Sequence, residues 1–226
     1  LSESKSQLSL GLDVRRYRTE CTPGDPGQAG CGPTGNNTQH ALPLALGYTL
    51  YRPDSYMLNI QWVHNLPWGS AGRDSDYAAN RAGADSRYQL LRLNAQVLGR
   101  LSPHWQLKWR LDGQVAPHAL ITAEQIGVAG SATVRGYEER ALVGDSGAST
   151  SLELSTRLDT LLNQPVSDAW PTLSFFADAG RVSNHLGSPC RPGHSSCTLW
   201  SAGIGASWAV GNRFFLRIDA ARAGTQ

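Results

Sequence analysis

The sequence predicts an all-β fold, part of an antiparallel transmembrane β-barrel with about nine strands. Three observations carry this prediction. Apolar and polar residues alternate along most of the chain, the alternating segments have similar lengths, and the connections between them are alternately short and long. A tilted strand of about ten residues crosses a bilayer. Membrane barrels also have short turns on one side and long loops on the other.

Alternation with a period of two residues is the strongest signal, because successive side chains of a strand point to opposite faces. It is clearest in "WQLKWRLDGQV" (105–115), where apolar residues occupy every odd position except that of a glycine. The predicted strands, in chain order, are 8–14, 42–50, 56–64, 91–97, 105–115, 152–158, 173–180, 199–210 and 214–220.

The connections between these strands alternate strictly in length. The short ones are 52–55, 102–104, 163–170 and 210–212, and the long ones are 19–41, 67–85, 119–147 and 183–198. A soluble sheet has no reason for this regularity. In a membrane barrel the short connections are periplasmic turns and the long ones are outer loops.

One face of each predicted strand is apolar, and the other carries most of the charges. An antiparallel sheet with one wet face has the same pattern, but it would need a second layer over the apolar face, and no helical pattern offers one. Tyr48, Tyr51, Tyr56, Trp105 and Trp208 lie near strand ends and fit interfacial girdles. The charged residues expected to line the lumen are Arg92, Lys108, Arg110, Glu153 and Arg157.

Composition narrows the possible partners. The net charge is +2 with no basic run, which argues against nucleic acid, because phosphate binding needs clustered cations. No apolar run reaches the ~18 residues of a transmembrane helix. The first residues, "LSESKSQLSL", lack the basic and apolar regions of a signal peptide. The chain is therefore expected to be either cytosolic or a piece of something longer.

The four cysteines form two close pairs, Cys21/Cys31 and Cys190/Cys197, both in predicted long loops. An even number in local pairs predicts two small disulfide loops in an oxidising compartment. A zinc site is the alternative, built from the four cysteines or from His185 and His194 with the second pair, but neither pair has CxxC spacing. We expect disulfides and no metal.

The long connection 119–147 carries the most informative motif. Its sequence "PHALITAEQIGVAGSATVRGYEE" (117–139) resembles the sixth extracellular loop of two-partner secretion transporters, the haemolysin secretion/activation family, which is related to the barrel-assembly insertases. The matching residues are Glu124, Gln125, Val134, Arg135, Gly136 and Tyr137.

A second match lies downstream. "FFADAG" (175–180) resembles a strand motif of the same superfamily and supplies Phe175, Phe176, Asp178 and Gly180. The resemblance implies that the loop folds back into the barrel and that Arg135 pairs with Asp178. Parity agrees, because Asp178 shares a strand face with Ser174 and Gly180 and would point into the lumen. A planar guanidinium suits a carboxylate because it can donate two parallel hydrogen bonds.

The resemblance also implies a function. The chain would be the C-terminal part of a sixteen-stranded barrel domain, covering residues 1–226 here, from its seventh to its fifteenth strand. The parent protein would be a monomeric barrel in the bacterial outer membrane, with its long loops extracellular. It would export a large unfolded partner polypeptide of haemolysin, haemagglutinin or adhesin type, without cofactor or catalysis.

Three alternatives remain open at this stage. A barrel-assembly insertase shares the loop arginine and the strand aspartate, and a passive porin or adhesin barrel would carry the loop resemblance by accident. "GDSG" (144–147) echoes the nucleophile loop of serine proteases, with Ser146 as nucleophile. His118 precedes that serine too closely for the two-barrel protease fold.

Overall fold

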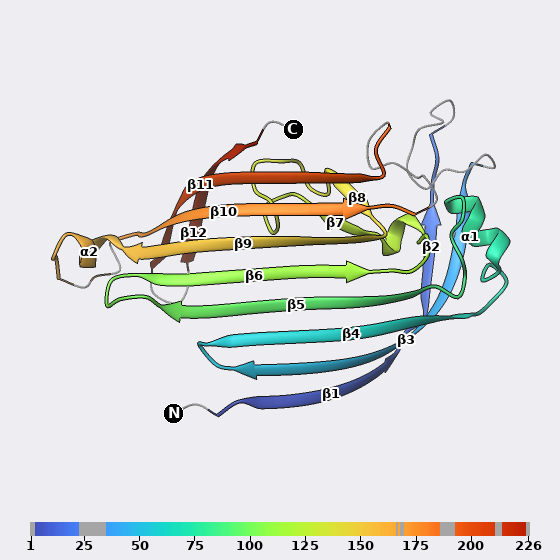
Figure 1. Ribbon diagram of the computed structural model, residues 1–226, viewed down its shortest axis with the longest axis horizontal. Helices are drawn as coiled ribbons and strands as arrows, with labels where there is room; N and C mark the ends of the chain where they lie inside the picture. The colour runs from blue at the N-terminus through green and yellow to red at the C-terminus, as the bar shows by residue number, and fades with distance from the viewer. Residues whose placement is uncertain are drawn as a thin grey trace.

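The computed structural model describes residues 3–22, 35–165, 167, 170–185, 193–210 and 214–224. Most of them form a ten-stranded antiparallel sheet with the order β1-β3-β4-β5-β6-β9-β10-β11-β12, in which β2 also pairs with β3. β7 and β8 form a separate two-stranded pair. The short connections lie at one end of the sheet and the long ones at the other (Figure 1). We call these the short-turn end and the long-loop end.

The elements have the following bounds. The strands of the large sheet are β1 Lys5–Leu12, β2 Arg15–Thr19, β3 Asn37–Arg52, β4 Tyr56–Pro67, β5 Gln89–Arg100, β6 Gln106–Val115, β9 Ser146–Arg157, β10 Thr172–Ser183, β11 Ser196–Val210 and β12 Phe214–Ala223. The remaining elements are α1 Asp74–Asn80, the 3₁₀ turn η1 Thr122–Glu124, β7 Ile126–Val128, β8 Leu142–Gly144 and α2 Leu158–Leu161.

The sheet matches the predicted strands. β1 and β2 both pair with β3 and are separated only at Asp13 and Val14, so they form one interrupted strand. β1 overlaps the predicted strand 8–14, whereas β2 lies just beyond it. The main difference is that β9 begins at Ser146 rather than at Leu152. The segment "SGAST" has no alternation of large apolar residues, yet its backbone pairs with β6 and β10.

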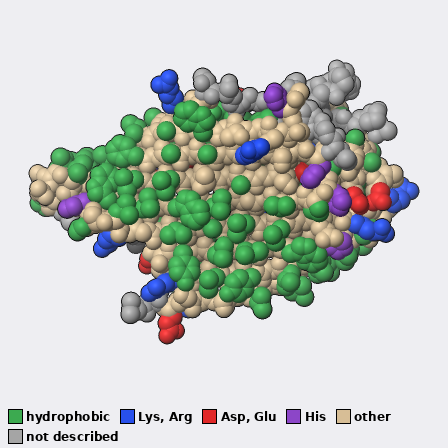
Figure 2. Space-filling model, in the orientation of Figure 1, with side chains coloured by type: hydrophobic (Ala, Val, Ile, Leu, Met, Phe, Trp, Pro, Cys, Tyr) green, Lys and Arg blue, Asp and Glu red, His purple; other side chains and the backbone are tan. Residues whose placement is uncertain are grey.

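The two faces of the sheet differ as predicted. Side chains on one face are apolar and exposed, among them Leu10, Trp62, Phe175, Ile204 and Ile218. Figure 2 shows this face, on which hydrophobic side chains spread over most of the sheet. We call it the apolar face, and the opposite one the polar face. The described residues include no helix long and apolar enough to cross a membrane.

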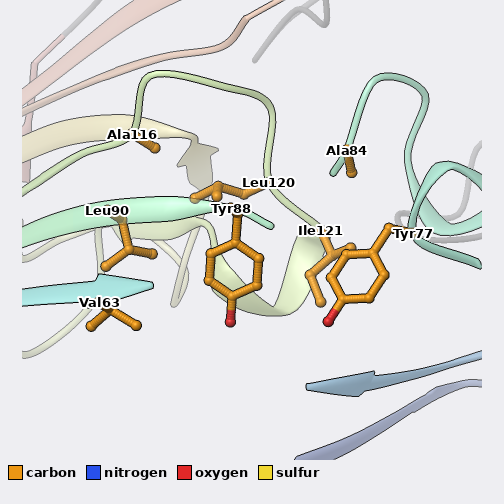
Figure 3. Packing of buried hydrophobic residues seen from close by; sticks show 8 residues of the cluster. All are labelled: Val63, Tyr77, Ala84, Tyr88, Leu90, Ala116, Leu120 and Ile121. Carbon is orange, nitrogen blue, oxygen red and sulfur yellow. The ribbon is translucent and has the colours of Figure 1, made fainter. Parts of the chain in front are cut away.

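Buried apolar residues gather at the long-loop end of the polar face, in two clusters. The first joins β4 and β5 to α1 and to residues 116–121, and Figure 3 shows eight of its side chains. The second joins β7 and β8 to β10 and β11. Both clusters form where a long connection folds back over the sheet, so these loops cover part of the polar face.

We predict that a charge on the apolar face destabilises the protein more than the same charge on the polar face. Ile204→Arg removes an exposed apolar side chain in the middle of β11, and an arginine facing lipid there costs about 2–4 kcal/mol. Gln96→Arg on the polar face of β5 is the matched control. Urea unfolding of the intact protein in vesicles measures both changes, and equal effects would contradict the membrane assignment.

Candidate functional site: the inner loop and its carboxylate partners

The connection between β6 and β9, residues 116–145, folds over the polar face, and we call it the inner loop. Its β7–β8 hairpin lies against β9 and β10. Val128, Val134 and Leu142 from the loop pack with Val182 and Leu199 of the sheet, and each of these side chains is buried. The predicted inward-folding segment 119–147 therefore lies over the sheet, although its last two residues are already part of β9.

Arg135 lies at the tip of this loop and contacts Asp178 of β10. Its Nε and Nη2 atoms each donate a hydrogen bond of 2.8 Å to one carboxylate oxygen, and its backbone N–H donates a third bond of 3.2 Å. The side chain of Arg135 is 6% exposed and that of Asp178 is 0% exposed. The pair expected from the sequence motifs is present, with the two-fold geometry that a guanidinium and a carboxylate favour.

Asp178 is one of several partners of Arg135. Nη1 donates to Glu153 at 2.9 Å and Nη2 donates to Ser151 at 3.2 Å. The guanidinium carbon lies 3.3 Å from the centre of the Phe176 ring, a distance at which the π-electrons attract the cation. The sequence predicts Glu153 in the lumen and Phe176 in the strand motif, but it predicts neither as a contact of Arg135.

A second arginine adds positive charge to this cluster. Arg217 of β12 donates to Glu153 at 2.7 Å and to Asp219 at 2.8 Å, and Asp219 lies 4.0 Å from Arg135. Two arginines thus share three carboxylates, and Lys108 lies opposite Glu153 in the ladder of β6 and β9. Sequence alone gave no signal for Arg217 and Asp219 beyond their polar-face parity.

Small residues let the loop tip approach the sheet. Gly136 has φ +89°, and an added Cβ atom would lie 3.1 Å from the Cβ of Ala221. At Gly180 an added Cβ would lie 3.0 Å from the side chain of Val134. Tyr137 donates its hydroxyl hydrogen to one of two backbone carbonyls, those of Trp200 and Gly224, each 3.0 Å away. Residues 134–137 therefore all contact β10, β11, β12 or Gly224, which directly follows β12.

Glu124 anchors the root of the inner loop on the other side of the polar face. Its carboxylate is 2% exposed and accepts hydrogen bonds from two arginines and two tyrosines: Arg15, Tyr17, Tyr88 and Arg92. Burial raises the pKa of Tyr88, and the negative charge of Glu124 raises it further. The Tyr88 phenol consequently remains a donor to the carboxylate.

Asp145 is a third buried carboxylate, and the sequence does not predict its role. It is 0% exposed and forms a two-fold ion pair with Arg81, which follows α1. Gln125 donates to it from the inner loop at 3.3 Å, and the backbone N–H of His185 donates at 2.8 Å. The only available signal was the "GDSG" segment. In the structure Ser146 Oγ hydrogen-bonds to the backbone of Ala116, which is not the geometry of a nucleophile bound to a histidine.

The expected lumen-lining residues lie on the polar face at different distances from the short-turn end. Arg92 borders a polar cavity of about 310 Å³ between β5, β6 and the inner loop. Lys108 and Glu153 border a cavity of about 460 Å³ nearer the short-turn end, and Arg110 lies on β6 between the two. Arg157 pairs with Asp159 of α2, so it marks the rim at the short-turn end.

Cys21 and Cys197 lie within the described residues, and neither is a free thiol. Cys31 and Cys190, to which we expected them to be bonded, lie outside the described residues, so the pairing stays a prediction. The described residues hold no cluster of histidine, cysteine and carboxylate side chains that would suit a metal ion.

Comparison with known proteins identifies the family. A family model described as haemolysin secretion/activation protein ShlB/FhaC/HecB matches residues 35–208. The chain belongs to this family. Its members are two-partner secretion transporters of the outer membrane, translocators rather than enzymes. Membership confirms the resemblance drawn from the two motifs and the prediction that the chain is not an enzyme.

Solved structures from the same class are similar in fold. CdiB from Escherichia coli matches with a TM-score of 0.63 and 20% identity, over 90% of this chain and 35% of that chain. CdiB from Acinetobacter baumannii matches with a TM-score of 0.57 and 19% identity, over 84% of this chain and 31% of that chain. The chain therefore spans about a third of the length of these structures. No curated protein sequence matches it.

We predict that exchanging Arg135 and Asp178 does not restore the loop anchor. In Arg135→Asp with Asp178→Arg, the new carboxylate at position 135 would face Glu153, which now accepts from Arg135, and like charges at this distance repel. Adding Glu153→Gln to the exchange should restore part of the anchor. Protease resistance of the inner loop measures each variant, and full restoration by the exchange alone would contradict the role of Glu153.

We predict that Gly136→Ala loosens the loop tip beyond the cost of its backbone conformation. A non-glycine residue at positive φ costs about 1–3 kcal/mol, and the added methyl would also press on Ala221. Gly35→Ala is the matched control, because Gly35 has φ +73° and nothing within 4 Å of an added Cβ. Equal losses of stability in the two variants would show that the contact with β12 is unimportant.

Proposed function

We propose that this chain is the C-terminal part of the barrel of an outer-membrane translocator that exports a large unfolded partner polypeptide by two-partner secretion. The partner would be of haemolysin, haemagglutinin or adhesin type. Family membership supports the transporter class. The observation that carries the mechanism is the buried contact of Arg135 with Asp178 and Glu153, which holds a loop inside the space through which the partner would pass.

The polar face would form the lumen wall and the apolar face would contact lipid, as a monomeric barrel. Arg92, Lys108, Arg110, Glu153 and Arg157 would then line a wet conduit. Two polar cavities along β5, β6 and β9 support this assignment. Side chains of this kind offer exchangeable hydrogen bonds to an extended polypeptide. The long-loop end would be extracellular, with disulfides Cys21–Cys31 and Cys190–Cys197 in the outer loops.

The functional residues would form two groups, the loop tip that acts as an anchor and the residues of β10 that bind it. Val134, Arg135, Gly136 and Tyr137 form the tip, and Phe176, Asp178 and Gly180 receive it on β10. Phe175 lies on the opposite face, 49% exposed, and would contact lipid. Glu124 and Gln125 would fix the root of the loop. Because a buried ion pair gains little net free energy, the anchor selects one loop position without making it permanent.

Partner secretion tests the proposal. In cells that make the intact transporter and its secreted partner protein, Arg135→Ala should reduce the partner in the medium at least tenfold. Arg135→Lys should reduce it less, because it keeps the charge but loses the planar fork. Arg222→Ala, at an exposed position of β12, is the control.

Two outcomes would point elsewhere. If the variant leaves secretion unchanged while other barrels disappear from the outer membrane, the protein is an insertase. If no partner is secreted by the wild type and only ion conductance is measured in planar bilayers, it is a passive pore.

A further inference from the structure

A second loop covers the long-loop end of the polar face. Residues 68–88, which include α1, form this segment, and we call it the lid. Gln39 of β3 donates to the backbone oxygen of Asp76 at 3.0 Å, and Asn65 of β4 donates to the hydroxyl of Tyr77 at 3.0 Å. Both wall residues are fully buried. The lid therefore lies over the polar face and not beside it.

The lid meets the root of the inner loop and closes the space between them. Ala84 of the lid forms a parallel bridge with Ala119 of the inner loop. Four large side chains at this contact are fully buried: Tyr77, Tyr88, Leu120 and Ile121. Figure 3 shows Ile121 beside Tyr77 and Leu120 beside Tyr88. The cavity bordered by Arg92 lies on the short-turn side of these residues and is lined by Ala123 and Gln125 of the same loop. A chain that moved along β5 and β6 towards the long-loop end would therefore meet the lid.

The lid is held by different contacts from those that hold the strands of the sheet together. α1 has seven residues, too few for a stable isolated helix. Beside this buried apolar cluster, polar contacts link the lid to the inner loop: Arg81 pairs with Asp145, and Asn80 accepts a hydrogen bond from the backbone N–H of Thr122 at 3.1 Å. When such a contact opens, both charges regain water, which offsets the Coulomb energy that is lost.

We propose that the lid is a gate at the outer end of the conduit and that the Arg81–Asp145 pair is its latch. The lid separates from the root of the inner loop to let the partner polypeptide out, while the Arg135 anchor stays in place. This inference rests on the proposed transport function and adds a moving part distinct from the anchor. The latch joins two loops, whereas Arg135 joins a loop to the wall.

A reversible cross-link tests the gate. Residues paired in a bridge are within reach of a disulfide, so Ala84→Cys with Ala119→Cys should tie the lid to the inner loop. In the intact transporter, oxidation should reduce partner secretion at least tenfold, and reduction should restore it. Each single cysteine variant, and the parent protein treated with the same reductant, are the controls. Normal secretion with the cross-link formed, as verified by mass spectrometry, would overturn the proposal.

Loss of the latch should have the opposite effect. Arg81→Gln with Asp145→Asn removes both charges together and leaves no unpaired ion, and it should raise the frequency of large-conductance openings in planar bilayers at least fivefold. Arg73→Ala is the matched control, because Arg73 pairs with Asp76 within the lid and is 74% exposed. Unchanged openings would overturn the latch. If the Arg135→Ala variant secretes normally while the cross-link still blocks export, the anchor proposal fails and the gate stands.

Discussion

The buried guanidinium of Arg135 constrains the rest of this structure. A cation that is 6% exposed needs carboxylates around it, since an unpaired buried charge costs several kcal/mol. Asp178 and Glu153 come from neighbouring strands that pair in register, and Phe176 supports the guanidinium plane. Only a glycine after the arginine and small residues on β12 let the loop tip come this close. One side chain thus specifies the path of the inner loop over the sheet.

The inner loop is held at its tip and at its root by different chemistry. The tip combines an ion-pair network with an apolar cluster against β10 and β11. The root uses Glu124 and Asp145, whose partners come from β2, β5 and the lid. Each of these carboxylates has several donors, so the loss of one hydrogen bond leaves others in place. In the proposed export, a polypeptide passing the loop would exchange hydrogen bonds at the root while the apolar cluster keeps the tip in place.

Particular residues show which contacts the sequence predicts and which it does not. Parity placed Asp178 on the polar face, and the two motifs brought it to Arg135, because both depend on local order along the chain. Parity also placed Glu153 on the polar face, but it did not predict the contact with Arg135. That contact depends on the register of β9 against β10, which neither strand shows alone. Arg81 gave no signal, and Asp145 gave none beyond its place in the "GDSG" segment. They are separated by more than sixty residues, and only the folding of two loops over the same end of the sheet brings them together.

The sequence by itself determined the strands, the side to which each side chain points and the identity of the loop that bears Arg135. These properties follow from the two-residue repeat of an extended chain and from short motifs, so neighbouring residues suffice. The tertiary structure decided which carboxylates share which arginine, where the lid closes and how the loop root is anchored. Those outcomes depend on strand register and on the packing of distant loops, which set distances between side chains that no local pattern encodes.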